Sequence, residues 1–304
     1  NANIVMSSRV RLARNLDKVP FSNWANKDRL EEVLVAVKDA ALSAGILSDA
    51  LFVRLKDLSE VDRLFLVERH LISPEHAENA DYKAVIIDPK EMISIMINEE
   101  DHLRIQVLLS GSNLRECWKV ADALDTELSK KLAFAYSAKW GYLTACPTNT
   151  GTGLRGSMML HLPALVFTGQ ISKILQAVAK LGLNIRGLYG EGTDATGNMF
   201  QISNQISLGI TEEEIIDNIE RIANQVISRE ASTRKTILLK NKEALVDRIS
   251  RALGTLRSAH IITSSETITL LSAIRLGVDL GIVKTMDRRT VHELFLLTQP
   301  AHLQ

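Results

Sequence analysis

The spacing of apolar and polar residues divides the chain into two regions of different character. Over residues 1–232, helix-like stretches alternate with short apolar or β-branched runs, which indicates helices mixed with antiparallel strands. After Ser232 the strand-like runs mostly stop, and the remaining spacing is typical of helices. We therefore expect an α+β domain, an antiparallel sheet flanked by helices, over residues 1–232 and an all-α domain over residues 233–304.

Helix-like stretches carry apolar residues three and four positions apart, as Leu30, Val33 and Leu34 do. Thr211 followed by Glu214 is the pattern of a capping box at a helix start. Strands are predicted where the apolar residues alternate or form short β-branched runs. Helices are predicted over residues 27–44, 60–70, 113–135, 172–181, 211–229, 241–256, 265–280 and 290–297, and strands over 83–88, 92–98, 102–109, 142–146, 157–162, 184–189 and 198–207.

Composition argues against several classes of function. Lys plus Arg and Asp plus Glu both number 36, so the charge favours neither nucleic acid nor an anionic membrane as a partner. Two cysteines, Cys117 and Cys146, and no Cys/His cluster with zinc spacing indicate a reducing, cytoplasmic location and no protein-held metal. No signal peptide is visible, and no apolar run approaches the roughly 20 residues that span a bilayer. Because the chain begins with Asn1 instead of Met and stops at Gln304, we expect both ends to be trimmed.

Charged residues concentrate beside predicted strands at four places. In the run 7–11, Ser-Ser-Arg-Val-Arg, the side chains of Arg9 and Arg11 share one face of a strand. Two guanidiniums on one face repel each other unless an anion lies between them, although a solvated sheet face accounts for the pair more simply. In the run 98–104, three consecutive carboxylates precede Arg104, which fits a charged turn or a carboxylate base beside a phosphate-binding arginine.

The other two places are rich in glycine. The run 146–157, Cys-Pro-Thr-Asn-Thr-Gly-Thr-Gly-Leu-Arg-Gly-Ser, resembles a phosphate loop but lacks the Gly-Lys-Ser/Thr ending of a P-loop. Its Cys146 fits a small buried residue better than a reactive thiolate. In the run 186–194, three glycines let the backbone approach a ligand, while the carboxylates there fit a plain turn equally well.

Together the four places supply five arginines and at least two carboxylates. Arginine forks bind phosphate oxygens bidentately and stay charged, so several on one site imply a polyanion such as a nucleoside triphosphate. Phosphoryl transfer needs mainly positioning and neutralisation of charge, which arginines and Mg²⁺ supply. The carboxylates then point to a cationic acceptor.

Four motifs, in this order, resemble those of the phosphagen kinases, the creatine and arginine kinase superfamily: Ser-Ser-Arg-Val-Arg, Asn-Glu-Glu-Asp-His-Leu-Arg, Cys-Pro-Thr-Asn and Arg-Gly-(x2)-Gly-Glu. The resemblance covers about residues 4–230. The variants at 190–193 and 200–205, and the tail with Leu-Thr-Gln-Pro at 297–300, are similar to the bacterial protein-arginine kinase branch.

The resemblance implies a role for each matching residue. Glu100 and Glu191 would hold the acceptor guanidinium, with Cys146 beside it, and Mg²⁺ would be held through the nucleotide. A guanidinium is protonated in water and a poor nucleophile, so two carboxylates that orient it and accept its proton suit this chemistry. The ATP site would be formed by Ser7, Ser8, Arg9, Val10, Arg11, His70, Arg104, Arg155, Gly156, Ser157, Met158, Met159, Arg186, Gly187, Leu188, Tyr189, Gly190 and Glu191, with the five arginines clamping the phosphates.

Two departures from the family pattern qualify this interpretation. Met159 stands where many small-molecule phosphagen kinases have histidine, although methionine is usual in the bacterial branch. The phosphoarginine-sensing motif of that branch, Arg-Asp-x-x-Arg-Ala, is not found and would lie after Gln304.

The resemblance therefore implies an ATP-dependent kinase that phosphorylates arginine side chains in proteins and so directs them to a bacterial AAA+ protease and relieves a stress repressor. A zinc-binding activator protein would assist, and residues 233–304 would form a dimerisation domain of a homodimer, truncated at its end. Two alternatives remain: a kinase for free arginine or another small guanidino compound, and a catalytically silent adaptor that binds proteins or phosphoarginine.

Overall fold

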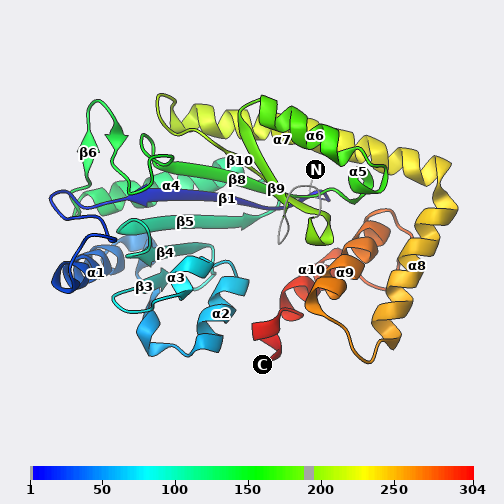
Figure 1. Ribbon diagram of the computed structural model, residues 1–304, viewed down its shortest axis with the longest axis horizontal. Helices are drawn as coiled ribbons and strands as arrows, with labels where there is room; N and C mark the ends of the chain where they lie inside the picture. Colours follow the sequence, from blue (N-terminus) through cyan, green and yellow to red (C-terminus); the bar gives the residue numbers. More distant parts are fainter. Residues whose placement is uncertain (1–2, 188–194) are drawn as a thin grey trace. The chain divides into compact units, whose positions relative to one another are not determined.

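The computed structural model describes residues 3–187 and 195–304. Within these residues, hydrogen bonds join eight strands into one sheet in the order β2-β3-β4-β5-β1-β8-β10-β9, and β6 pairs with β7 separately (Figure 1). The pairs from β2 to β5 are antiparallel, which agrees with the predicted sheet. The strands are β1 (Val5–Arg14), β2 (Leu51–Arg54), β3 (Ala84–Ile87), β4 (Ile93–Ile97), β5 (Leu103–Ser110), β6 (Tyr136–Ser137), β7 (Gly141–Tyr142), β8 (Leu154–His161), β9 (Leu183–Gly187) and β10 (Met199–Asn204).

Side-chain caps begin several of the helices, because the first backbone N–H groups of a helix lack partners within it. Ser59 and Asp62 form a reciprocal capping box before α2, and the Thr263 hydroxyl accepts from the N–H of Glu266 before α9. The helices are α1 (Lys27–Leu42), α2 (Glu60–Glu68), α3 (Pro74–Ala77), α4 (Leu114–Ser129), α5 (Pro163–Phe167), α6 (Ile171–Lys180), α7 (Glu212–Lys240), α8 (Lys242–Ser258), α9 (Ser264–Asp279) and α10 (Arg288–Leu297), with short 3₁₀ turns η1 (Gly45–Leu47), η2 (Leu55–Asp57), η3 (Thr196–Asn198) and η4 (Pro300–Leu303).

The chain folds into two compact units. The meander unit holds residues 8–157 and 204–218, and the tail unit holds the described residues of 1–7, 158–203 and 219–304. The antiparallel meander β2–β5 lies in the first unit and β9 in the second, while β1, β8 and β10 contribute residues to both. The helices after residue 240 therefore share a compact unit with β9 and with most of β10.

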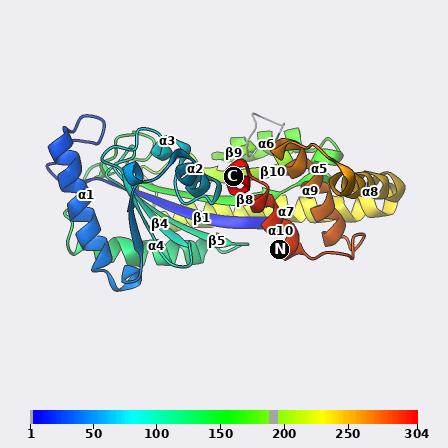
Figure 2. The ribbon, with the colours of Figure 1, turned by 90° about the horizontal axis from the view of Figure 1, so that it is seen from below.

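In the meander unit, helices cover both faces of the sheet. Figure 2 shows α1 and α4 on one face of β3, β4 and β5, and α2 and α3 on the other. Successive side chains of a strand point to opposite faces, so Val85, Ile87 and Met96 pack with Leu55 and Leu71 under α2 and α3. The alternate residues of the same strands, all buried, face the other layer.

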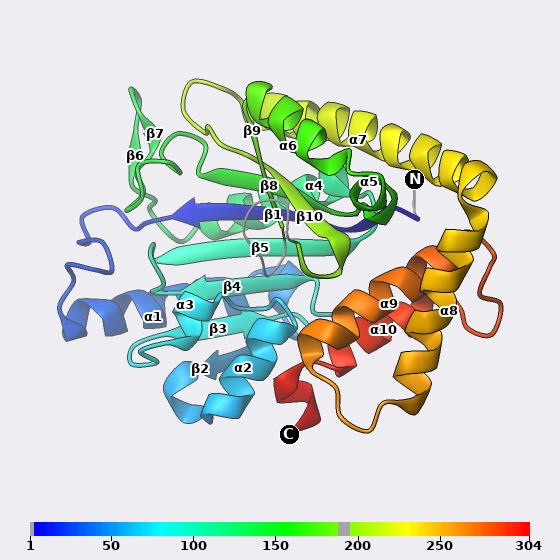
Figure 3. The same cartoon turned by 45° about the vertical axis from the view of Figure 1, so that its right-hand side comes forward.

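In the tail unit, α8, α9 and α10 pack side by side (Figure 3). Leu245 and Ile249 of α8 form one buried cluster with Leu276 of α9, and Ile274 forms another with Val291 of α10. The apolar faces of these helices are thus buried against one another within the chain.

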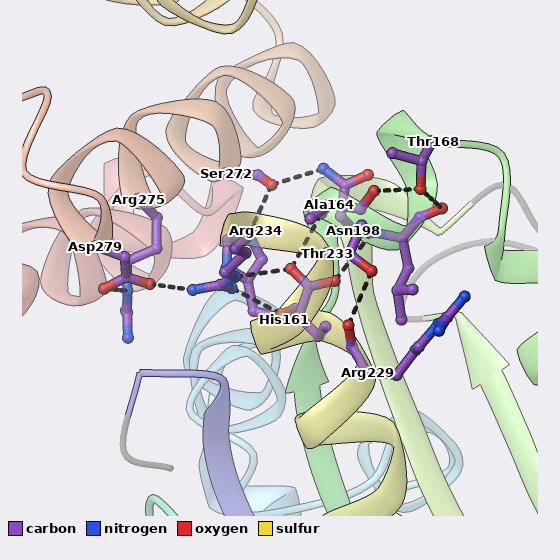
Figure 4. Close-up of polar contacts among 12 residues, drawn as sticks. His161, Ala164, Thr168, Asn198, Arg229, Thr233, Arg234, Ser272, Arg275 and Asp279 are labelled. Carbon is purple, nitrogen blue, oxygen red and sulfur yellow. Dashed lines mark hydrogen bonds and ion pairs between the residues drawn. The ribbon is translucent and has the colours of Figure 1, made fainter. Parts of the chain in front are cut away.

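A group of five charged side chains lies inside the tail unit, and we call it the tail ion cluster: Glu230, Arg234, Arg275, Asp279 and Arg288. The Arg234 guanidinium donates to Glu230 Oε1 at 2.8 Å and to Asp279 Oδ2 at 2.9 Å (Figure 4). Arg288 Nε donates to the other oxygen of Asp279 at 2.6 Å. Arg275 Nε lies 3.7 Å from that same oxygen. The Asp279 carboxylate therefore interacts with three guanidiniums, one each from α7, α9 and α10.

The structure differs from the predicted elements in several places. The helix predicted over 113–135 ends at Ser129, because residues 133–135 pair instead with the segment after β1: Ala135 N–H donates to Asn15 O at 2.7 Å and Asp17 N–H to Ala133 O at 2.8 Å. The strand predicted over 142–146 is reduced to Gly141–Tyr142, because the residues after it turn into a loop. Helix α7 continues through residue 232 as far as Lys240.

Candidate active site

The strand β1 places two arginines on one face of the sheet. Ser8 and Val10 are buried, whereas Arg9 and Arg11, which alternate with them, are half-buried. The Ser8 hydroxyl donates to Gly111 O at 2.7 Å and accepts from Asn113 N at 3.0 Å. These bonds fix which residues of β1 face each side, and the predicted same-face arrangement of the two arginines is present.

Arg104 and Arg155 join these two residues from the neighbouring strands β5 and β8, and we call the four the sheet arginine cluster. Burial, together with the charges of Arg104 and Arg155, lowers the pKa of Arg9 to about 10. Burial and the three other guanidiniums hold the pKa of Arg11 well below its ordinary value, while Glu99 acts in the opposite direction. Cations forced together in this way are stabilised by an anion with several charges.

Glu99 is built into the edge of this cluster. Its side chain is 6% exposed, forms an ion pair with Arg104 and accepts a hydrogen bond from Ser73, the N-cap residue of α3. Although burial opposes ionisation, Arg104 and the Ser73 hydroxyl keep the pKa of Glu99 below its ordinary value. Glu99 therefore orients Arg104, a role that the sequence did not assign to it.

Glu100, the next residue, lies in a different environment. Its side chain is exposed at the surface, and the nearby Cys146 thiol, which lies 3.0 Å from the Thr148 hydroxyl, favours the ionised form of the carboxylate. Partial burial and the neighbouring charges of Asp101 and Glu99 raise the pKa of Glu100. A carboxylate with a raised pKa is a better proton acceptor near neutral pH. The structure thus brings together two residues, Glu100 and Cys146, that the family resemblance placed at the acceptor.

A buried polar network holds the loops of Glu100 and Cys146 together. Asp101 accepts from Asn15 Nδ2 at 2.6 Å and from Ala145 N–H at 2.7 Å. The Asn15 side chain also donates to Leu143 O at 3.0 Å and accepts from His102 N–H at 2.9 Å. Sequence reasoning missed Asp101 and Asn15 as positioning residues. The sequence signal for Asp101 was its place as the third carboxylate of the 98–104 run. Because Glu99 and Glu100 precede it, the whole run also fits a charged turn.

The glycines of the 146–157 run serve close packing. A Cβ on Gly151 would lie 2.2 Å from Ser207 O, and one on Gly153 would lie 2.7 Å from Ala13 O. Both residues also have positive φ, 115° and 66°, which favours glycine. The sequence of this run resembles a phosphate loop without a P-loop ending. In the structure, these two glycines let β1 and the segment after β10 approach the loop.

The remaining predicted nucleotide contacts fall in several places. His70 follows α2 in the meander unit, where its carbonyl accepts from Gln106 Nε2 at 2.6 Å. On β8, Arg155 and Met159 are half-buried, with buried residues between them. Arg186 is exposed on β9 of the tail unit. Leu188, Tyr189, Gly190 and Glu191 lie outside the described residues, so these assignments stay predictions, as do those of Ser7, Gly156, Ser157, Met158 and Gly187.

The part of the chain that the structure describes contains neither a cluster of metal ligands nor a membrane-spanning helix. Across 3–187 and 195–304, no three His, Cys, Asp or Glu side chains are arranged to hold a metal ion. In the same part of the chain, every helix is too short or too polar to cross a bilayer.

Comparison with protein families agrees with this fold and these motifs. Residues 32–233 match the model of the ATP:guanido phosphotransferase C-terminal catalytic domain, and the chain belongs to this family of guanidino kinases. Residues 242–304 match a second model, the C-terminal domain of the protein-arginine kinase McsB. The predicted class of enzyme and α+β fold are thereby confirmed.

Curated relatives align with almost the whole of this chain. The chain is 51% identical to the protein-arginine kinase of Halothermothrix orenii over 99% of this chain and 86% of that protein. It is 50% identical to that of Symbiobacterium thermophilum, over 100% of this chain and 87% of the relative.

Solved structures share the fold at lower identity. Lombricine kinase aligns with a TM-score of 0.67 at 23% identity, over 76% of this chain and 67% of that one. The duplicated taurocyamine kinase from Schistosoma mansoni, with bound transition-state analogue components, aligns with a TM-score of 0.70 at 25% identity, over 82% of this chain and 37% of that one.

Proposed function

We propose that this protein transfers the γ-phosphoryl group of ATP to arginine side chains of other proteins. The observation that carries the proposal is the pairing of Glu100 with Cys146 in the same compact unit as the sheet arginine cluster. Such a unit provides positive charge for a polyphosphate and a carboxylate for a cationic acceptor. The match of residues 242–304 to the C-terminal domain of a protein-arginine kinase supports proteins as the source of that acceptor.

In this proposal, the sheet arginine cluster binds the phosphates. Arg9, Arg11 and Arg155 would contact phosphate oxygens, and Glu99 would hold Arg104 in place for the same purpose. The guanidiniums repel one another in the free protein, and the negative phosphates of the nucleotide would remove this repulsion. The same guanidiniums would stabilise the negative charge that develops in the transition state. Mg²⁺ bound to the nucleotide would neutralise further phosphate charge. Arg186 and the segment 188–191 are retained as additional nucleotide contacts.

Glu100 would act on the acceptor. Its carboxylate orients the guanidinium and takes one N–H proton as that nitrogen forms a bond to the γ-phosphorus and the bond to the β-phosphate oxygen breaks, which releases ADP. The raised pKa of Glu100 favours this transfer, because it lies closer to the pKa of the guanidinium than an ordinary carboxylate pKa does. The nearby Cys146 thiol would help to fix the carboxylate beside the acceptor. Glu191 is retained as the second carboxylate.

The wider biological role rests on the family resemblance alone. We retain as proposals a catalytic domain over 1–232, a dimerising helical domain over 233–304 in a homodimer, and a cytoplasmic location. Marking of proteins for an AAA+ protease, control of a stress response and assistance by a zinc-binding activator are proposals of the same kind.

The test is phosphorylation of an arginine-containing basic peptide, a matched peptide with lysine at each arginine, and free arginine, each with radiolabelled ATP and Mg²⁺. We expect acid-labile phosphate on the arginine peptide only. Label on free arginine at equal efficiency would favour a small-molecule kinase, and no label with intact peptide binding would favour an adaptor.

A variant pair then tests the role of Glu100. Glu100→Gln keeps the shape of the side chain but removes its charge and basicity, so kcat should fall by roughly 10²–10⁴-fold. Glu116→Gln, an exposed change on α4, is the matched control and should leave kcat intact. Single-turnover kinetics with nucleotide titration separates the chemical step from ATP binding, and a Glu100→Gln enzyme of normal rate would contradict the assignment.

A further inference from the structure

A groove of about 790 Å³ opens beside the β6–β7 hairpin, and we call it the hairpin groove. Every residue that lines it belongs to the meander unit. The lining comes from the hairpin, which is separate from the eight-stranded sheet (Figure 3), from the residues that follow α4, and from the segment that leads into α7. The proposed function uses none of these residues, so the groove needs its own explanation.

Aromatic rings form the hairpin side of the groove. Tyr136 and Trp140 are 62% and 47% exposed, and the ring centroids of Tyr136 and Tyr142 lie 5.3 Å apart in an edge-on arrangement. The Arg14 guanidinium lies 3.5 Å from the centroid of the Tyr142 ring, and Asp125 matches its charge at 2.8 Å. Exposed aromatic faces attract cations, because the face of the ring carries partial negative charge.

Two carboxylates line the same groove. Glu212 and Glu214 belong to the first turn of α7, and the exposed Glu213 between them is outside the lining. Glu214 accepts hydrogen bonds from the Thr211 N–H and hydroxyl at 2.9 and 3.0 Å. Burial raises the pKa of Tyr142 against the effect of Arg14, and the charge of Glu212 contributes to the rise. Rings and carboxylates side by side suit a cationic side chain with an apolar stem.

A cation of the hairpin itself already uses one of these rings. Lys139 Nζ lies 4.6 Å from the centroid of the Trp140 ring, and both residues are exposed members of the lining. An incoming cation would therefore compete with Lys139 for Trp140. Removing the Lys139 charge should strengthen the binding of such a cation, whereas removing a carboxylate should weaken it.

The hairpin groove adjoins the loop that carries Cys146. The Ser207 hydroxyl, in the lining, donates to Thr148 O at 2.8 Å, and Thr148 Oγ1 lies 3.0 Å from Cys146 Sγ. The N–H of Tyr142 donates to Gly151 O at 2.8 Å and closes the base of this loop. Tyr142 and Cys146 are four positions apart, so their Cα atoms lie at most about 14 Å from each other. An extended substrate chain would cover that distance with about four residues.

We propose that the hairpin groove binds a second cationic side chain, lysine or arginine, that lies within about four residues of the arginine being phosphorylated in the same substrate. The proposal rests on the proposed function, because that function places the acceptor at Glu100 and Cys146. It adds a preferred class of substrate, which is a segment of protein with clustered basic residues. Free arginine cannot occupy both places at once, so the groove favours protein segments over the free amino acid.

The test uses peptides with a single arginine and one variable position, placed one to five residues before or after it. This position carries lysine, glutamine or leucine. For wild-type enzyme, kcat/KM at the best position should be about 3–30-fold higher with lysine than with glutamine, chiefly through KM, because a cation–π contact and an exposed ion pair add together. Leucine should resemble glutamine.

Four variants assign this lysine-to-glutamine ratio to the groove. Glu212→Gln and Trp140→Ala should each reduce the ratio about 2–5-fold, whereas Lys139→Gln should raise it by a similar factor. The matched control is Glu213→Gln, which removes the same charge from the same helical turn outside the lining and should leave the ratio unchanged.

A ratio of one at every position in the wild-type enzyme would overturn the proposal. So would a preference for leucine over lysine, or equal reductions in Glu212→Gln and Glu213→Gln. Fluorescence anisotropy of the labelled peptides without nucleotide gives the same ratio as dissociation constants and requires no phosphoryl transfer. Selective binding of the lysine peptide by an enzyme that transfers no phosphate would therefore contradict the proposed function and support the preference of the groove.

Discussion

The two groups of arginines in this molecule are built on opposite principles. In the sheet arginine cluster, burial and the charges of Arg9, Arg104 and Arg155 all lower the pKa of Arg11, whereas the charge of Glu99 raises it. In the tail ion cluster, Arg234 is matched by two carboxylates at 2.8 and 2.9 Å. The first arrangement has an excess of positive charge, which the nucleotide of the proposed function would neutralise. The second neutralises its charge within the protein.

The difference shows that the ratio of cations to carboxylates separates a binding site from a structural network more clearly than the number of arginines does. Buried charges of one sign repel one another, so a protein retains an excess of one sign chiefly where a ligand supplies the other. Glu230 illustrates the opposite solution, because its two oxygens accept from Ala164 N, Leu165 N and Arg234 Nε at 2.8–3.0 Å. Three predictions probe the contrast, from the largest expected effect to the smallest.

Glu230→Gln breaks the tail ion cluster at its most buried member. The amide replaces one accepting oxygen by a donor that faces other donors, and it leaves Arg234 short of a counter-charge. We expect the free energy of unfolding to fall by about 3–5 kcal/mol, the range for breaking a buried ion pair. Chemical denaturation measures the loss. A decrease below about 1 kcal/mol would mean that the network is dispensable for stability.

Arg11→Ala should weaken ATP binding and leave stability almost unchanged, which is the reverse of the stability loss expected for Glu230→Gln. Removing one of several repelling guanidiniums should leave stability without nucleotide unchanged or slightly higher. ATP binding should weaken by about 10–150-fold, because a charge-assisted contact contributes roughly 1.5–3 kcal/mol. Thermal melting and nucleotide titration of the same sample report both quantities. A marked loss of stability with normal ATP affinity would place Arg11 among the structural arginines instead.

The smallest expected effect is on the pH dependence of the free energy of unfolding, and it involves His161, which lies near Arg234 and Arg275. Its pKa is lowered in the folded protein by burial and by these two charges, so the unfolded chain binds a proton first. Stability present above the ordinary histidine pKa of 6.5 is therefore lost as pH falls below it. His161→Gln should reduce the slope of unfolding free energy against pH by up to about 1.4 kcal/mol per pH unit. An unchanged slope in the variant would show that other histidines, such as buried His76, carry the dependence.

Local sequence pattern was sufficient for the parts of the molecule that depend on short-range spacing. The same-face pair Arg9 and Arg11 follows from the two-residue period of a strand, and the helices of the tail follow from apolar spacing. The sequence predicts a domain boundary after residue 232, and on either side of it Glu230 is 0% exposed and Arg234 is 5% exposed. Arg234 pairs with Asp279, and Glu230 accepts hydrogen bonds from the N–H groups of Ala164 and Leu165. No local pattern encodes these distant partners.

The candidate site shows the same limit. Three adjacent carboxylates were visible in the sequence, but their different roles were not. Glu99 forms an ion pair with Arg104, and Glu100 lies near the Cys146 thiol. Asp101 accepts hydrogen bonds from the Asn15 side chain and the Ala145 N–H. These assignments depend on loops from three parts of the chain that meet only in the folded protein.

The hydrogen bonds that Ser8 makes with Gly111 and Asn113 bear on how this enzyme can be altered by insertion. A single extra residue between Ser8 and Arg9 would turn the guanidiniums of Arg9 and Arg11 into the apolar layer and bring Val10 to the ligand face, because side chains alternate along a strand. Two extra residues would restore the alternation but move both arginines along the strand by about 6.6 Å, at roughly 3.3 Å per residue. The short segment 8–11 is therefore constrained in its length as well as in its arginine side chains.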